Sequence, residues 1–262
     1  YTESMRDSKK GGYGIITIGE AFVKSSNIGI SKVINESYKA DPHDFIDRIY
    51  KMGLSTPLDL ELPFPNNLLI KTPQTKGWSG VSLPWMSIGY EMQLTPIHML
   101  TFYNAIANNG RMVKPIFTSK IIKEDKVLMD RNTTMINPSI CSQATINKVI
   151  PLLEAVVQRG TAKGIYSEQY QIAGKTGTTV LDYSRDNQES FERRYQTSFV
   201  GFFPARKPKY SCIVVVNDPR GDFHYGGDVA APVFKEISDK VFAFDVEMHD
   251  DLEQSSCLPS FP

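Results

Sequence analysis

A change in the hydrophobic pattern near residue 170 constrains the fold more than any other feature of the sequence. Before it, apolar residues recur three or four positions apart, which is the spacing of amphipathic helices. After it come short runs rich in β-branched and aromatic residues, separated by turn signals that contain Pro, Gly and Asp. A last helical pattern covers 229–244. Helices followed by an antiparallel meander and a closing helix predict an α+β fold.

The individual elements are predicted from the same patterns. The clearest helix begins at Thr95-Pro96, where the threonine can cap it, and is stopped by Asn108-Asn109-Gly110. Residues 55–80 have no period and are predicted to form a long loop, whereas a pair of strands is expected over 116–127 around Glu124-Asp125-Lys126. Further helices are expected at 15–23, at 42–52 with Asp41 as its cap, and at 143–157. Strands are expected at 170–179, 197–203 and 210–216, of which the last is predicted to be buried.

The composition argues against several classes of function. The 262 residues include 29 basic and 29 acidic side chains, so the net charge of zero gives no sign of binding to nucleic acid or to an anionic membrane. No apolar run approaches the ~18 residues that span a bilayer, and no signal peptide is expected within this sequence. The four histidines and three cysteines show no metal-ligand spacing. The sequence therefore predicts neither a metal site nor a cofactor.

Two short motifs point to a chemistry. Lys175-Thr176-Gly177-Thr178 falls in the first predicted strand, and Ser25-Ser26-Asn27 falls at the junction between two predicted helices. Serine enzymes that are acylated by penicillin combine Lys-Thr-Gly and a Ser-x-Asn motif with Ser-x-x-Lys, which carries the nucleophile. No serine in this sequence has lysine three residues later. The nucleophile is therefore not expected in this chain.

The strand motif suits the binding of a peptide that ends in D-alanyl-D-alanine. Lys175 can hold a positive charge near the terminal carboxylate, and the hydroxyls of Thr176 and Thr178 can donate hydrogen bonds to it. Gly177 leaves the strand face without a side chain, so a substrate can lie along the backbone as an extra strand. The backbone N–H of Thr178 can then contribute to an oxyanion hole.

The helix-junction motif suits proton transfer. Ser25 can relay a proton to the leaving amine, and Asn27 can form a hydrogen bond with the amide of the substrate. Each motif also has a purely structural interpretation, because Ser and Asn commonly cap helices and a Lys-Thr-Gly occurs by chance in on the order of a few per cent of chains this long. Their order, spacing and context favour the functional interpretation.

Further segments resemble the transpeptidase domain of class B penicillin-binding proteins, most closely the division-type enzyme that cross-links septal peptidoglycan. They occur in the order of that family and span roughly residues 12–244. The resembling segments are Lys24–Gly29, Ser87–Tyr90 with Leu94–Pro96, Ala107–Gly110, Gly160–Ala162, Ala173–Thr178, Ser198–Pro204 and Gly226–Phe234.

The resemblance implies a β-lactamase/transpeptidase-like fold, in which helices flank a five-stranded antiparallel sheet. In that family two strands and the helix with Ser-x-x-Lys precede Ser-x-Asn. Because this sequence starts at Tyr1 rather than Met, we expect a piece of a longer protein. Residues 1–244 are then the C-terminal part of a transpeptidase domain that lacks its N-terminal strands and nucleophile helix, and 245–262 form a disordered tail. Without its partner, strand 210–216 leaves an open sheet edge. The fragment is expected to self-associate through this edge, or to cover it with one of its own segments such as the tail after Asp245.

The resemblance also implies an activity. The parent protein would be a serine-type D-Ala-D-Ala transpeptidase that cross-links peptidoglycan stem peptides through an acyl-enzyme and is bound by β-lactams. It would act with other cell-wall synthesis proteins at the extracytoplasmic face of the bacterial inner membrane, anchored by a segment outside this chain, and the fragment alone is expected to be inactive. Two alternatives stay open: a D,D-carboxypeptidase or β-lactamase, and a non-catalytic module or sensor that binds β-lactams or peptidoglycan.

Overall fold

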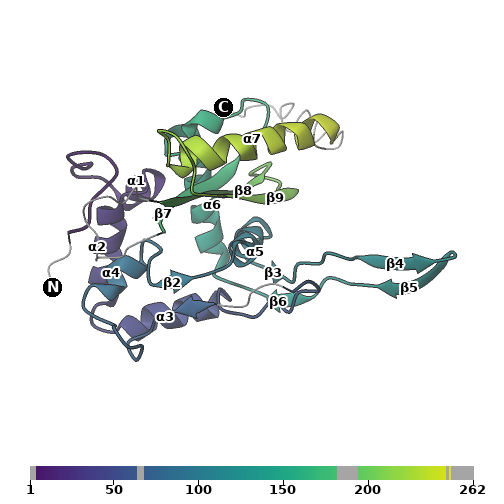
Figure 1. The fold of residues 1–262 in the computed structure, drawn as a ribbon, viewed down its shortest axis with the longest axis horizontal. Coiled ribbons are helices and arrows are strands. Elements are labelled where there is room, and N and C mark those ends of the chain that lie inside the picture. Colours follow the sequence, from purple (N-terminus) through teal and green to yellow (C-terminus); the bar gives the residue numbers. More distant parts are fainter. Residues whose placement is uncertain (1–3, 64–67, 182–193, 246–247, 249–262) are drawn as a thin grey trace, which may run out of the picture. The chain divides into compact units, whose positions relative to one another are not determined.

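The chain forms two compact units, Tyr1–Leu152 and Leu153–Pro262. The computed structural model describes residues 4–63, 68–181, 194–245 and 248 (Figure 1). The first unit consists mostly of helices with short two-stranded ladders, and the second holds a three-stranded antiparallel sheet and a long helix. The predicted α+β class is therefore confirmed.

Two helices of the first unit begin at the predicted caps. The Asp41 carboxylate accepts a hydrogen bond from the backbone N–H of His43, and the Thr95 hydroxyl accepts one from His98. The second of these helices ends where Asn109 and Gly110 adopt left-handed backbone angles, with φ of 54° and 84°. The helices are α1 (Ile18–Val23), α2 (Asn27–Tyr38), α3 (Pro42–Lys51), α4 (Ser82–Met86) and α5 (Pro96–Ala107).

Short ladders complete this unit. β1 (Leu69–Ile70) pairs with β2 (Met92–Gln93), and β3 (Met112–Val113) pairs with β6 (Met135–Asn137). The prediction of an uninterrupted loop over 55–80 is thus wrong, because a two-residue strand is too short to show a period. Its Ile70 packs in a buried cluster that also contains Ile46, Ile49 and Met86.

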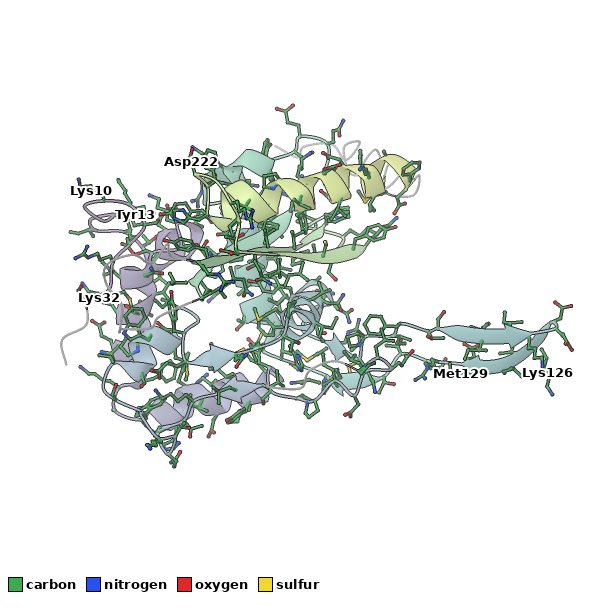
Figure 2. All side chains as sticks on the ribbon, viewed as in Figure 1. Lys10, Tyr13, Lys32, Lys126, Met129 and Asp222 are labelled. Carbon is green, nitrogen blue, oxygen red and sulfur yellow. The ribbon has the colours of Figure 1, made fainter. Side chains whose placement is uncertain are left out.

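The predicted hairpin is confirmed at its turn, but its strands cover 120–130 and not 116–127. β4 (Lys120–Lys123) pairs with β5 (Lys126–Asp130), and Glu124 and Asp125 form the turn with φ of 48° and 60°. Two consecutive positive φ angles are typical of the type I′ turn that suits the twist of a hairpin. Figure 2 shows side chains extending from both strands, among them Lys126 and Met129.

The second unit is built on the strand order β7-β8-β9. β7 (Ala173–Val180) and β9 (Tyr210–Asn217) flank β8 (Tyr195–Phe203). Helix α7 (Gly226–Phe244) packs on one face through Phe234, whose ring centroid lies 4.8 Å from that of Phe199 and 5.8 Å from that of Phe203. Helix α6 (Gln143–Arg159) and the 3-10 turn η1 (Lys163–Ile165) precede the sheet.

The sequence made two further predictions for this unit, on the burial of its last strand and on its C-terminal tail. The prediction that 210–216 is a buried strand is wrong, because 211–216 are only half-buried on a strand at the edge of the sheet. The predicted disordered tail lies outside the described residues except for Asp245 and Met248. Among the residues that the structure describes, no helix is long and apolar enough to span a bilayer.

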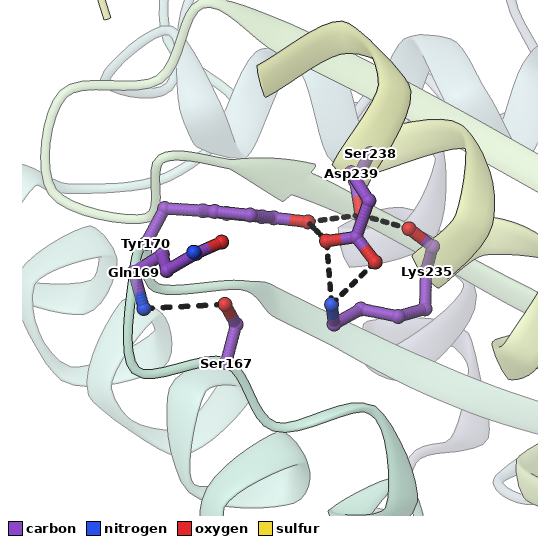
Figure 3. Close-up of polar contacts among 6 residues, drawn as sticks. All are labelled: Ser167, Gln169, Tyr170, Lys235, Ser238 and Asp239. Carbon is purple, nitrogen blue, oxygen red and sulfur yellow. Dashed lines mark hydrogen bonds and ion pairs between the residues drawn. The ribbon is translucent and has the colours of Figure 1, made fainter. Parts of the chain in front are cut away.

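A buried tyrosine links the residues just before β7 to α7 (Figure 3). Tyr170 donates a hydrogen bond of 2.7 Å to Asp239 Oδ1 and lies 2.8 Å from Ser238 Oγ. Its ring stacks on Phe242 at 4.8 Å between centroids, and Lys235 Nζ lies 2.6 Å from the other carboxylate oxygen of Asp239. Burial and the neighbouring carboxylate raise the pKa of Tyr170. This contact fixes the entry of the chain into β7 relative to α7.

Candidate active site

The outer edge of β7 presents backbone donors. Leu181 N–H donates to Arg194 O at 2.8 Å, in register with the β7–β8 pairs. Because residues in an antiparallel ladder alternate between bonding the partner and pointing away from it, the N–H groups of Thr176 and Thr178 point away from β8. No strand of the described part of the chain pairs with that side of β7. The motif therefore lies along an open sheet edge.

Lys175 brings a positive charge to the same edge. Its side chain leaves the strand on the opposite face from Thr176 and Thr178, since neighbouring residues alternate. Its ammonium nevertheless donates to Thr176 O at 3.3 Å, and this carbonyl points toward the open edge. Burial disfavours the charged form and lowers the pKa of Lys175 to about 8. The ammonium is therefore still mainly protonated at neutral pH.

The two threonine hydroxyls lie on the face of the sheet that carries α7. Thr178 is exposed, and its hydroxyl accepts a hydrogen bond of 3.1 Å from the N–H of Gly226, the first residue of α7. Because this bond uses a lone pair, the hydroxyl proton of Thr178 can still be donated to a ligand. The hydroxyl oxygen of Thr176 lies 2.7 Å from that of Thr161.

Glycines allow this part of the sheet to pack closely. A Cβ on Gly177 would lie 2.5 Å from the Ser198 hydroxyl on the neighbouring strand, so the missing side chain also makes room for Ser198. A Cβ on Gly226 would lie 2.4 Å from Ser198 O and 2.5 Å from Gly177 O. The first turn of α7 can therefore approach β7 closely only with glycine at this position.

The second motif lies at the junction of α1 and α2, as predicted, in the other compact unit. Ser25 has a left-handed backbone with φ of 52°, and its N–H donates to Phe22 O at 3.2 Å. Ser26 is buried and caps α2, because its hydroxyl accepts a hydrogen bond of 2.9 Å from Gly29 N–H. Few non-glycine residues adopt such a φ, which suggests that the position of Ser25 is imposed by its surroundings.

An N-terminal segment supports this junction. Asn27 Nδ2 donates to Arg6 O at 3.0 Å, and both Ser26 Oγ and Ile28 N donate to the Asp7 carboxylate at 3.1 Å. Sequence reasoning missed Arg6 and Asp7, because nothing in the local pattern links them to a helix start so far along the chain. One of the two N–H donors of Asn27 Nδ2 is thus used, and its side-chain oxygen can accept a hydrogen bond.

The described residues contain no group of three or more His, Cys, Asp or Glu placed to hold a metal ion. The two motifs themselves offer amide, hydroxyl and ammonium groups. Such groups can bind a carboxylate, align a peptide backbone and transfer protons, which is the set of tasks that acyl transfer from a peptide requires.

Transpeptidase domains are among the solved structures with the same fold. The transpeptidase domain of penicillin-binding protein 3 from Burkholderia pseudomallei superposes with a TM-score of 0.72 and 26% identity over 92% of this chain and 67% of that one. Penicillin-binding protein 3 from Mycobacterium tuberculosis, complexed with aztreonam, gives 0.66 and 28% over 94% and 52%. The fold is thus that of penicillin-binding proteins. A family model of the penicillin binding protein transpeptidase domain matches residues 2–239, so the chain belongs to this family.

Curated relatives point to the same group. The peptidoglycan D,D-transpeptidase FtsI of Buchnera aphidicola subsp. Baizongia pistaciae is 30% identical over 228 residues, which cover 86% of this chain and 37% of that protein. FtsI of Escherichia coli K12 is 28% identical over 227 residues, or 86% and 35%. The chain spans about a third of the length of these relatives.

Proposed function

We propose that this chain is the substrate-binding part of a serine-type D,D-transpeptidase, which binds the D-alanyl-D-alanine end of a peptidoglycan stem peptide along the open edge of β7. One observation carries the proposal: the N–H groups of Thr176 and Thr178 and the ammonium of Lys175 all face this edge. The names of the curated relatives support the same substrate class.

An extended peptide fits such an edge as an added strand. Its carbonyl groups accept hydrogen bonds from the outward N–H groups, and the N–H of Thr178 contributes to the oxyanion hole at the carbonyl that is attacked. The terminal carboxylate then binds the ammonium of Lys175 and the hydroxyls of Thr176 and Thr178 through charge-assisted hydrogen bonds. Gly177 keeps the strand narrow where the ligand passes.

We assign the helix-junction motif to the leaving group and the substrate amide. Ser25 relays a proton to the departing amine, and Asn27 accepts a hydrogen bond from the substrate N–H through its side-chain oxygen. The bond that Asn27 Nδ2 donates to Arg6 O orients this side-chain amide. The supporting evidence is the family membership and the fixed geometry of this junction.

The reaction needs a nucleophile that these residues do not include, because no serine has lysine three positions later. We propose that sequence outside these 262 residues provides it. In the whole protein the serine oxygen attacks the carbonyl of the penultimate D-alanine, terminal D-alanine leaves as the amine, and an ester forms. The amine of a second stem peptide then attacks the ester and releases the serine. Such a protein would act at the outer face of the inner membrane with other cell-wall enzymes and would be inhibited by β-lactams.

Calorimetric titration of the chain with N-acetyl-D-alanyl-D-alanine tests the binding role. We expect binding that weakens by about tenfold in Lys175→Met, the size of a charge-assisted hydrogen bond. Lys24→Met is the matched control, because Lys24 pairs with Glu20 at 3.5 Å on α1 and has no assigned role. Equal losses in the two variants, or equal affinity for N-acetyl-D-alanyl-L-alanine, would contradict the proposal.

The missing Ser-x-x-Lys favours one second candidate, a non-catalytic module that binds β-lactams or peptidoglycan. Intact-mass analysis after incubation with penicillin distinguishes the candidates when it is run on both the chain and the whole protein. We expect no covalent adduct on the chain and one adduct on the whole protein. No adduct on either would support the module, and an adduct on the chain that is lost in Ser25→Ala would make Ser25 the nucleophile.

A further inference from the structure

Thr161, outside both motifs, contacts one of the proposed carboxylate donors. Its hydroxyl oxygen lies 2.7 Å from that of Thr176, which is a short and well-formed hydrogen-bond distance. Both side chains belong to the second compact unit, and the contact is partly buried. The hydroxyl of Thr176 therefore has one fixed neighbour, and a ligand meets it in an orientation that this neighbour influences.

The backbone holds Thr161 in place from two sides. It follows the end of α6, where Ala162 N–H donates to Val156 O at 3.1 Å and the Ala162 side chain is buried. The first turn of α7 lies directly against its carbonyl, because a Cβ on Gly227 would come within 2.1 Å of Thr161 O. The backbone of Thr161 is thus held in a constrained turn, which fixes the position from which its hydroxyl reaches Thr176.

The direction of this hydrogen bond decides what Thr176 offers to a ligand. If Thr176 donates to Thr161, a lone pair of Thr176 is left for the ligand, which repels a carboxylate. If Thr161 donates to Thr176, the proton of Thr176 is available to the carboxylate, and the two bonds form a chain in which each polarises the next. An anion at the edge of β7 therefore selects the second direction.

We infer that Thr161 is a positioning residue of the carboxylate site, which donates to Thr176 and so directs the hydroxyl proton of Thr176 to the ligand. This inference rests on the proposed function, since it assigns Thr161 to the same site. Thr161 itself does not touch the substrate. The hydroxyl of Thr178 is oriented in the same way by the N–H of Gly226, so both threonine donors are set by neighbours outside β7.

The test compares N-acetyl-D-alanyl-D-alanine with its C-terminal carboxamide, titrated into the whole chain. The dissociation constant of the carboxamide divided by that of the acid measures carboxylate recognition. A general loss of packing would weaken both ligands equally and leave this ratio unchanged. Thr161→Val should lower this ratio about fivefold, the worth of one ordinary hydrogen bond, whereas Thr161→Ser should keep it. Thr179→Val is the matched control, because it removes a hydroxyl from the other face of β7.

A double-mutant cycle with Thr176→Val makes the test specific. If Thr161 acts through Thr176, then Thr161→Val should change the ratio no further in the Thr176→Val background. An undiminished effect there, or a loss of affinity that is equal for the acid and the amide, overturns the inference. If thermal unfolding shows that Thr161→Val does not fold, Thr161→Cys, a weak donor of similar size, replaces it. A wild-type ratio near one overturns the proposed function itself, and the inference with it.

Discussion

At the scale of single residues, one buried hydroxyl lacks a partner near the candidate site. Thr197 on β8 lies opposite Thr178, its side chain has no exposed surface, and its Oγ1 forms no hydrogen bond within the described residues. A desolvated hydroxyl without a partner destabilises the folded state, whereas valine has nearly the same shape. We expect Thr197→Val to raise the free energy of unfolding by about 1 kcal/mol.

Chemical denaturation measures this change. The matched variant is Thr101→Val on α5, because the Thr101 hydroxyl is also buried but donates to Ile97 O at 2.7 Å. That substitution should lower the free energy of unfolding by about 1 kcal/mol. If both variants lose stability to the same extent, the Thr197 hydroxyl has a partner after all, such as a bound water.

Lys175 gives a second prediction at this scale. Burial lowers its pKa from 10.5 to about 8, so the ammonium is present below pH 8 and is lost as the pH rises through this value. Affinity for N-acetyl-D-alanyl-D-alanine should therefore fall between pH 7 and pH 9, because only the charged form attracts the carboxylate. Titrations at several pH values should show this fall in the wild type and a flat profile in Lys175→Met. A wild-type profile without a step near pH 8 would contradict the assignment.

At this scale, the sequence could predict only features that belong to a local motif. The backbone N–H of Thr178 was predicted to be a hydrogen-bond donor to the substrate. Strand alternation does point this N–H to the open edge. The contacts of Asp7 with the start of α2 and of Thr161 with Thr176 were not predicted. Each joins segments that are distant along the chain, and only the fold brings these segments together.

At the scale of elements, the approach of α7 to β7 depends on one glycine. A Cβ on Gly226 would lie 2.4 Å from Ser198 O and 2.5 Å from Gly177 O, and neither backbone atom can move away without shifting a strand. Gly226→Ala should therefore lower the free energy of unfolding by about 1–3 kcal/mol, although alanine favours helices. It should also weaken carboxylate binding, since it displaces the N–H that orients Thr178.

Thermal unfolding and the peptide titration test this prediction together. Gly164→Ala in the same unit is the control, because no heavy atom lies within 4 Å of the position of its Cβ. We expect that control to be neutral or slightly stabilising. If Gly226→Ala behaves like Gly164→Ala, the close approach of the helix is not required.

The elements themselves were largely predictable where a local signal marks them. The caps at Asp41 and Thr95 and the hairpin turn at Glu124-Asp125 were all confirmed. The short strand β1 was missed, since two residues show no periodicity. The burial of β9 was overestimated, because an apolar run does not reveal whether its strand has one neighbour or two.

At the scale of the whole molecule, the outer edge of β9 has no partner strand in the described part of the chain. Apolar strands at an open edge pair readily with other chains. The tail begins beside this strand, because Asp245 accepts a hydrogen bond of 2.8 Å from the Tyr210 hydroxyl and lies 3.6 Å from Lys209 Nζ. We therefore propose that the chain self-associates through β9 unless its own tail covers that edge.

Deletion of residues 246–262 separates the two possibilities. If the tail covers β9, the intact chain should be monomeric by light scattering on a size-exclusion column, and the deletion should shift it to dimers or larger species. If the tail does not cover it, both forms should associate, and Val215→Lys should reduce association because a charge on an edge strand opposes pairing. Hydrogen exchange at Ser211, Ile213 and Val215, whose N–H groups point away from β8, should be slow whenever the edge is paired. Monomers of both forms with rapid exchange there would show that the edge is tolerated and the proposal is wrong.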